Sequence, residues 1–274
     1  MSGFLTKVCA EARTRVAEAA RHEPFETLRA RALERPAPPG FAAALVSDGV
    51  AVIAEVKRAS PSRGQLASIP DPIALAHRYA EGGASAVSVL TEPTHFAGRL
   101  DDLAGIAAAV SLPVLRKDFV VDPYQVFEAR AAGAAAVLLI VAALGQPDLT
   151  GLLVAAGQAG LDALVEVHDQ DEAERAVQAH RTAGTGWPLV IGVNARDLVT
   201  LTVDPDRFEA VRGWLPEDAI TVAESGVRGP ADVRRLADLG ADAVLVGEHV
   251  ATAAAPAAAV RALVEAGTRQ EASP

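Results

Sequence analysis

The stretch VAVIAEVK, residues 50–57, carries the pattern that decides the fold. β-Branched apolar residues run through it and its charged residues lie only at the carboxyl end, as in a strand buried on both faces of a sheet. Outward from this stretch, seven further apolar runs predict strands, at 85–91, 113–118, 135–141, 162–167, 189–194, 219–224 and 242–247.

Amphipathic or Ala-rich stretches separate these runs and predict helices, at 72–81, 101–109, 123–132, 147–159, 170–180, 205–213, 230–239 and 256–266. Three of them begin with an Asp-Pro pair, at 71–72, 122–123 and 204–205, which combines a helix-capping acceptor with a first-turn proline. Eight strand–helix repeats predict an α/β fold, a (β/α)₈ TIM barrel. An open doubly wound sheet is the alternative, but no G-x-G-x-x-G follows the first strand.

The chain divides into an amino-terminal extension, 1–49, the barrel, 50–268, and a short tail, 269–274. Within the extension, residues 4–20 and 24–34 are predicted to be helical, and RPAPPG at 35–40 is a stiff connector. We expect the tail to be frayed.

Composition limits the kinds of partner. The chain has 274 residues, half of them hydrophobic, with a net charge of −10. A broadly negative field disfavours nucleic acid and anionic membranes, but it permits an anionic small substrate at a local positive site. Cys9 is the only cysteine, the amino terminus lacks an apolar signal run, and the longest nearly apolar stretch, 131–144, is too short to span a bilayer. We expect a cytoplasmic protein, and leave protein partners open, a monomer included.

Lysine is rare, occurring only at positions 7, 57 and 117, while the other basic residues are arginines. Asparagine occurs once, at 194. Lysine is compact and can release its proton, whereas arginine stays charged, so a retained lysine invites a chemical explanation.

Polar residues at the carboxyl ends of the strands are the candidate site, because the active sites of such barrels lie there. Period-two alternation directs Glu55 and Lys57 the same way, and Lys117 away from Arg116 and Asp118. The convergent set is Glu55, Lys57, Lys117, Glu166, Asn194 and Glu224. Structural ion pairs are the alternative, but burying so much charge without a task is costly. Carboxylates raise a lysine's pKa and burial lowers it, and a lysine with a pKa near the working pH can act as a general acid.

Glycines at the ends of the last two strands predict a phosphate cradle. Glu224-Ser225-Gly226 and Val246-Gly247-Glu248 occupy the positions that bind phosphate in many barrels, although a glycine after a strand is often only a turn. The polar loop at 60–64 suggests a mobile lid, or an ordinary exposed loop. The histidines at 22, 77, 95, 180 and 249 lack paired spacing, so no metal site is expected. His168 lies on the face of Glu166, and could support it or lie exposed at the rim.

Six strings at successive strand ends, AEVKRASPSRG, LRKDF, ALVEVH, IGVNARDL, AESGV and AVLVGE, resemble the indole-3-glycerol-phosphate synthase family. The resemblance covers about residues 25–268. It implies ring closure, decarboxylation and dehydration of 1-(o-carboxyphenylamino)-1-deoxyribulose 5-phosphate, a carbon–carbon lyase reaction of tryptophan biosynthesis that needs no cofactor. It also implies that the extension lies over the barrel mouth.

The resemblance implies roles for individual residues. Lys117 would be the general acid at the ketose oxygen, Lys57 would hold the substrate carboxylate with help from Glu55, and Glu166 would transfer protons during dehydration. The implied substrate-binding residues are Ser60, Phe119, Asn194, Arg196, Glu224 and Ser225, and the implied phosphate-binding residues are Gly226, Gly247 and Glu248.

Two features depart from the family pattern: His249, where a small residue is more usual, and a long connection at 181–187. A phosphoribosylanthranilate isomerase is the nearest enzymatic alternative, but its chemistry calls for a cysteine base at the first strand. A catalytically silent phosphate-binding barrel would be expected to have lost a site residue.

Overall fold

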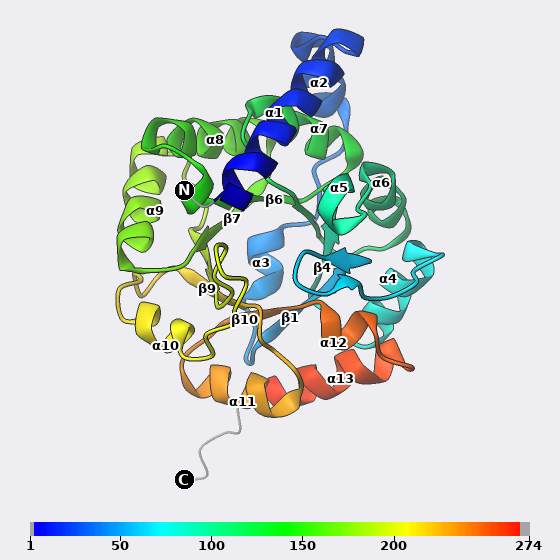
Figure 1. Cartoon of the computed structure of the whole chain (residues 1–274), viewed down its shortest axis with the longest axis vertical. Coiled ribbons are helices and arrows are strands. Elements are labelled where there is room, and N and C mark those ends of the chain that lie inside the picture. Colours follow the sequence, from blue (N-terminus) through cyan, green and yellow to red (C-terminus); the bar gives the residue numbers. More distant parts are fainter. Residues whose placement is uncertain (1–2, 269–274) are drawn as a thin grey trace.

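A computed structural model describes residues 3–268, and the tail predicted at 269–274 lies outside this range. Eight parallel strands close into a barrel in the order β1-β10-β9-β8-β7-β6-β5-β4 (Figure 1). The strands are β1 (Ala51–Val56), β4 (Ala86–Leu90), β5 (Val114–Lys117), β6 (Ala136–Ile140), β7 (Asp162–Val167), β8 (Val190–Asn194), β9 (Ile220–Glu224) and β10 (Ala243–Val246). The predicted fold class is confirmed.

β1 closes the barrel because it pairs with a strand on each side. Ile53 is in register with Ala86 of β4, and Ala51 with Ala243 of β10. All six residues of β1 are buried, as expected for a parallel strand whose two faces are covered by the barrel interior and by helices.

Eight helices form the outer ring: α4 (Pro72–Glu81), α6 (Leu100–Ala109), α7 (Pro123–Ala132), α8 (Gln146–Ala159), α9 (Gln170–Ala183), α10 (Arg207–Arg212), α11 (Pro230–Asp238) and α13 (Pro256–Gly267). Asp71 and Asp122 cap α4 and α7 as predicted, accepting from the amides of Ala74 at 2.9 Å and Tyr124 at 2.8 Å. The predicted cap at Asp204 is wrong. Asp204 instead closes a turn before the helix, where its carboxylate accepts the amide of Asp206 at 3.1 Å, and α10 begins only at Arg207.

Short elements interrupt the repeat where the sequence predicted loops. The segment predicted as a lid contains a small hairpin of β2 (Ala59–Ser60) and β3 (Gly64–Gln65). One-turn helices follow β4, β6 and β10, namely α5 (Pro93–Phe96), the 3₁₀ helix η1 (Val141–Ala143) and α12 (Glu248–Ala251).

The extension forms α1 (Gly3–His22), α2 (Phe25–Glu34) and α3 (Phe41–Leu45). α1 crosses one side of the ring of strands (Figure 1). α3 packs at the opposite end of the barrel, where the Ala42 amide donates to Asp162, the first residue of β7, at 2.8 Å. Within residues 3–268, no helix is both long and apolar enough to cross a membrane.

Candidate active site

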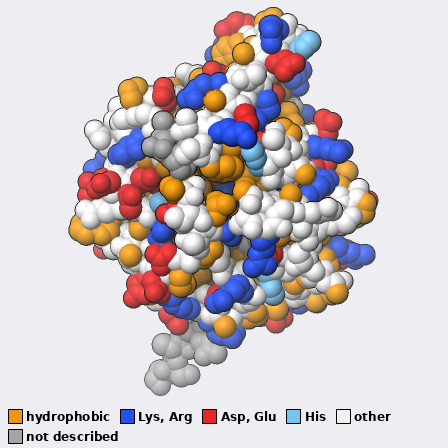
Figure 2. Space-filling view, in the orientation of Figure 1, with side chains coloured by type: hydrophobic (Ala, Val, Ile, Leu, Met, Phe, Trp, Pro, Cys, Tyr) orange, Lys and Arg blue, Asp and Glu red, His pale blue; other side chains and the backbone are white. Residues whose placement is uncertain are grey.

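A cavity of about 710 Å³ opens at the carboxyl ends of the strands. In Figure 2, apolar and basic side chains surround a hollow near the middle of this face. Every site residue expected from the sequence lines the cavity: Glu55, Lys57, Ser60, Lys117, Phe119, Glu166, Asn194, Arg196, Glu224, Ser225, Gly226, Gly247 and Glu248. Strand topology brings them together, because parallel strands in a barrel all end at one rim.

Lys117, the last residue of β5, lies between two buried carboxylates. Its Nζ is 3.4 Å from Oε2 of Glu166 on β7 and 3.3 Å from Oε2 of Glu224 on β9. Both glutamates are almost completely buried, and 16% of the lysine side chain is exposed. The lysine therefore faces the cavity with its ammonium held from two sides.

The three members of this cluster differ in the direction and cause of their pKa shifts. Burial disfavours the charge on Lys117, but the carboxylates of Glu224, Glu166 and Glu55 outweigh burial and raise its pKa above the ordinary value. Burial works against the charge of Glu166 too, yet Lys117 and His168 lower its pKa. Burial, only partly opposed by Lys117, raises the pKa of Glu224 to about 8. The group that titrates near neutral pH is therefore Glu224, while Lys117 stays protonated.

A second lysine–glutamate pair lies at the end of β1. Lys57 Nζ is 3.5 Å from Glu55 Oε1, and the Ser88 hydroxyl donates to Glu55 Oε2 at 3.4 Å. The Lys57 ammonium also lies 5.8 Å from the centre of the Phe96 ring, a cation–π distance. Glu55 is only 3% exposed, so this ion pair holds the Lys57 ammonium in place beside the Lys117 cluster.

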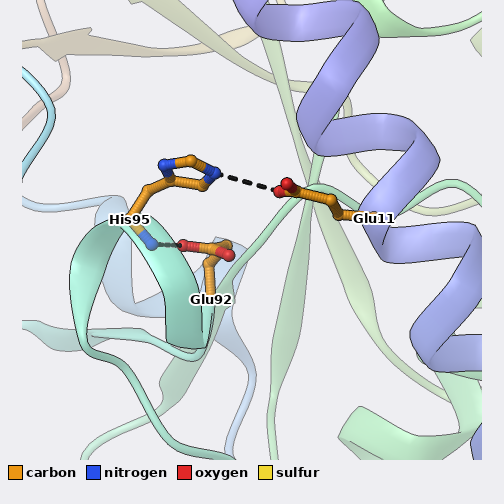
Figure 3. Close-up of side chains that lie close together, drawn as sticks. All are labelled: Glu11, Glu92 and His95. Atoms are coloured by element: carbon orange, nitrogen blue, oxygen red, sulfur yellow. Dashed lines mark hydrogen bonds and ion pairs between the residues drawn. The ribbon is translucent and has the colours of Figure 1, made fainter.

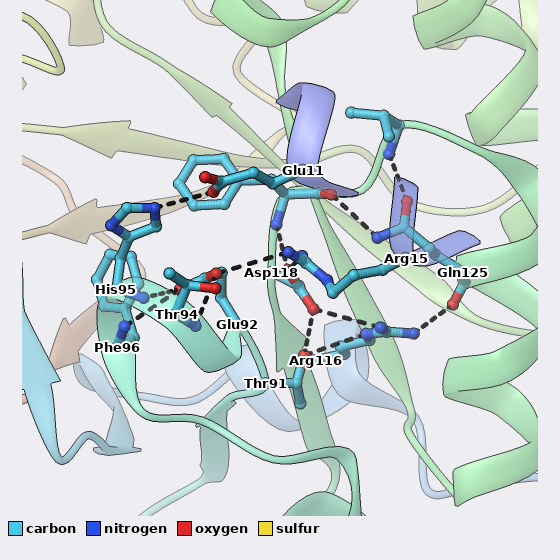
Figure 4. Close-up of polar contacts among 12 residues, drawn as sticks. Glu11, Arg15, Thr91, Glu92, Thr94, His95, Phe96, Arg116, Asp118 and Gln125 are labelled. Atoms are coloured by element: carbon cyan, nitrogen blue, oxygen red, sulfur yellow. Dashed lines mark hydrogen bonds and ion pairs between the residues drawn. The ribbon is translucent and has the colours of Figure 1, made fainter. Parts of the chain in front are cut away.

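Arg116 and Asp118, the chain neighbours of Lys117, belong to a separate polar network, although Asp118 also lines the cavity. Asp118 accepts from the Thr91 hydroxyl at 2.6 Å, the Phe119 amide at 2.8 Å and Arg116 at 3.3 Å. Arg15 of α1 reaches the same carboxylate at 3.3 Å (Figure 4). This network confirms the predicted alternation along β5 and connects the extension to the strand that carries Lys117.

The amino end of α1 reaches the cavity itself. Phe4 lines the cavity and packs edge-on against Phe119, with ring centres 6.4 Å apart. Further along α1, Glu11 faces His95 at 3.0 Å (Figure 3). Phe4 was not predicted from the sequence, because nothing local to residue 4 indicates its contact with a residue more than a hundred positions away.

Glu11, Glu92 and His95 lie close enough to suggest a metal site, which the histidine spacing did not predict (Figure 3). However, Glu92 caps α5, and its oxygens accept the amides of Thr94 at 3.0 Å, His95 at 2.6 Å and Phe96 at 3.1 Å. The Glu11 carboxylate already pairs with His95. These side chains are committed to docking α1 on α5.

The loops after β9 and β10 both line the cavity. Ser225 and Gly226 are consecutive residues in the left-handed region, with φ of 65° and 80°. Successive residues that turn away from extended geometry leave N–H groups free to face an anion. Gly247 follows at the start of α12, where the Glu248 side chain pairs with Arg63 from the β2–β3 hairpin.

Several positions singled out by the sequence lie in or near the cavity. The His168 side chain is 11% exposed, with Nδ1 2.9 Å from Glu172 and Nε2 3.6 Å from Glu166, so it backs Glu166 and is not exposed at the rim. Burial opposes its charge, but these two carboxylates raise its pKa. Arg196 contacts the Ser62 hydroxyl of the hairpin at 3.4 Å. The long connection at 181–187 lies away from the cavity lining, whereas His249 is part of it.

Known proteins resemble this chain over most of its length. The family model described as indole-3-glycerol phosphate synthase matches residues 5–263. The indole-3-glycerol phosphate synthase of Mycolicibacterium gilvum is 57% identical over 241 residues, covering 88% of this chain and 86% of the relative. That of Mycolicibacterium smegmatis is 55% identical over 244 residues, covering 89% and 87%.

Solved structures agree on the fold alone. A 3-hexulose-6-phosphate synthase from Salmonella typhimurium has a TM-score of 0.60 at 17% identity, covering 79% of this chain and 98% of its own. A thiamine phosphate pyrophosphorylase from Pyrococcus furiosus has a TM-score of 0.58 at 15% identity, covering 80% and 95%. The family match over nearly the whole chain and the close sequence relatives lead to one conclusion: the chain belongs to the indole-3-glycerol phosphate synthase family.

Proposed function

We propose that the cavity converts 1-(o-carboxyphenylamino)-1-deoxyribulose 5-phosphate to indole-3-glycerol phosphate, releasing carbon dioxide and water as a step of tryptophan biosynthesis. The observation that carries the proposal is the Lys117 ammonium held between the buried carboxylates of Glu166 and Glu224 inside the cavity. The names of the relatives support the same activity.

Lys117 acts on the ketose oxygen in the first step. A carbon–carbon bond forms between the ring carbon that bears the carboxylate and the ketone carbon, while the carbonyl π electrons move to oxygen. The ammonium stabilises this developing charge more strongly than it stabilises the ground state, and then gives the oxygen a proton. The raised pKa of Lys117 keeps the proton in place until that oxygen develops negative charge.

Lys57 pairs with the substrate carboxylate during binding, and Glu55 holds the lysine in position from 3.5 Å. When carbon dioxide leaves, the electrons of the broken bond return to the ring, so the carboxylate must be able to lose its ionic partner. One lysine partly balanced by Glu55 binds that carboxylate less tightly than an unpaired cation would.

Glu166 moves protons in the last step, in which the carbinol hydroxyl takes up a proton and leaves as water. The adjacent ring methylene carbon loses a proton, so the indole double bond forms and the nitrogen keeps its hydrogen. The lowered pKa of Glu166 keeps it ionised as a base, and His168 at 3.6 Å supports that charge. Burial raises the pKa of Glu224, so of the two carboxylates beside Lys117 it takes up a proton more readily, which lowers the negative charge that faces an anionic substrate.

The remaining residues bind the substrate in this proposal. Backbone amides at Gly226, Gly247 and Glu248 hold the phosphate, and Ser60, Phe119, Asn194, Arg196 and Ser225 contact the rest of the molecule. We further propose that α1 covers the mouth, that no cofactor takes part, and that the protein acts in the cytoplasm on this phosphorylated small molecule, with no nucleic-acid or membrane partner.

The test is turnover by purified protein without added metal, followed through the fluorescence of the indole product. We expect saturation kinetics, with carbon dioxide released in equal amount. A folded sample that leaves the substrate unchanged contradicts the proposal. Conversion of phosphoribosylanthranilate in a parallel assay would favour the isomerase instead.

A further inference from the structure

Two glutamate carboxylates of the cavity lie directly against glycines of the barrel wall. A Cβ atom on Gly192 would fall inside the van der Waals radius of Glu224 Oε1 and only 3.0 Å from its Cδ. A Cβ on Gly247 would collide in the same way with Glu55 Oε1 and lie 3.3 Å from its Cδ. The same arrangement thus occurs twice around the two lysines.

Backbone conformation does not explain these glycines. Gly247 has φ of −107°, and Gly192 also lies outside the left-handed region that favours glycine. Gly192 lies inside strand β8, where glycine weakens the strand, so close approach of another group explains its presence. Here that group is a carboxylate in each case.

Gly192 occupies the middle of β8, in register with Glu166 on β7 and Val222 on β9. Glu224 lies two residues further along β9, and its carboxylate extends back over Gly192. From there its Oε2 meets Lys117 at 3.3 Å. The Glu224 carboxylate therefore fills the space that a side chain at position 192 would take, and from there it pairs with Lys117.

We propose that Gly192 is a positioning residue, which lets the Glu224 carboxylate lie against the barrel wall so that Lys117 is held centrally and the cavity above it stays free. A methyl group at this position moves the carboxylate off the wall, into the volume in front of Lys117. The expected effect on turnover rests on the proposed function, whereas the effect on Lys117 does not.

A packing defect must be separated from this effect, because the same Cβ would lie 3.2 Å from Leu164 Cδ1. Shortening Glu224 to aspartate withdraws the carboxylate by one methylene and leaves Leu164 untouched. Only a clash with Glu224 can therefore be relieved by Glu224→Asp.

The kinetic experiment compares wild type, Gly192→Ala, Glu224→Asp and the double variant. We expect Gly192→Ala to lower kcat/KM about 100-fold, as a misplaced catalytic group of this kind does. We expect Glu224→Asp to raise the activity of Gly192→Ala about fivefold or more, so that the two changes are not additive. The proposal is overturned if the activity of Gly192→Ala stays within about twofold of wild type. It is also overturned if the effects of the two substitutions simply add in the double variant.

The matched control is Gly151→Ala on α8, where a Cβ meets nothing within 4 Å and wild-type activity is expected. If Gly192→Ala does not fold, circular dichroism of the double variant decides. Folding restored by Glu224→Asp supports the clash, and failure to restore it overturns the proposal.

A second readout needs no turnover. The chain has three lysines, so ¹³C labelling at lysine Cε gives three NMR signals, and Lys117→Arg identifies that of Lys117. We expect Gly192→Ala to shift the Lys117 signal while the Lys7 signal stays unmoved, and the double variant to shift it back. If these shifts are seen but the wild-type protein shows no turnover, only the proposed function is refuted. If the Lys117 signal does not move in Gly192→Ala, the positioning role is refuted.

Discussion

Replacing Glu224 with glutamine should abolish a loss of stability that the wild-type protein suffers as the pH rises. Burial, only partly opposed by Lys117, raises the pKa of Glu224 from its ordinary 4.5 to about 8 in the folded protein. Because the folded pKa is raised, the stabilising contribution is complete below pH 4.5 and is lost as the pH rises through about 8.

The magnitude follows from proton linkage. Between pH 5.5 and 7.5 the unfolded chain has released the Glu224 proton and the folded protein retains it. A difference of one proton changes the free energy of unfolding by about 1.4 kcal/mol per pH unit, so wild type loses about 3 kcal/mol across this window. Glutamine carries no titrating proton, so the variant lacks this contribution.

The assay is equilibrium unfolding in urea at pH 5.5 and 7.5, with the change in free energy compared between wild type and Glu224→Gln. His168, whose pKa is also raised, contributes equally to both proteins and cancels in the comparison. Glu217→Gln in an exposed loop is the control and should lose stability as wild type does. Equal losses in wild type and Glu224→Gln would show that Glu224 does not retain its proton in the folded protein across this window.

Two further substitutions test the lysine and the extension. Lys117→Arg should keep the fold and the charge but lower kcat about 100-fold or more, because arginine cannot release a proton; near-normal rates in steady-state assays would mean that Lys117 is only a fixed charge. Arg15→Gln removes the contacts with Asp118 and Glu92, and should lower the free energy of unfolding by ~1 kcal/mol, discounted for partial exposure. Arg15→Gln should also raise KM more than it lowers kcat, whereas the control Lys7→Gln should leave both unchanged. An unchanged KM in Arg15→Gln would mean that α1 plays no part in substrate binding.

Much of the fold was predictable because its signals are local. Each strand is a short apolar run flanked by a helical pattern, and eight such repeats leave few topologies. The direction of Lys117 was predictable too, since alternation along β5 places Arg116 and Asp118 on the other face. The cap at Asp204 failed because its carboxylate accepts the amide of Asp206 within a turn, and the helix begins only after that turn.

Local sequence patterns were enough to establish the barrel, the rim that carries the site, and the residues that meet there. The electrostatics of the site and the contacts between distant residues arise only in the folded chain. The pKa of Glu224 depends on burial and on charges from strands scattered along the chain. Arg15 meets Asp118 across 103 positions. The need for glycine at position 192 comes from the Glu224 carboxylate that lies against it. Desolvation, Coulomb energy and steric fit vary over a few ångströms of space, which linear spacing does not record.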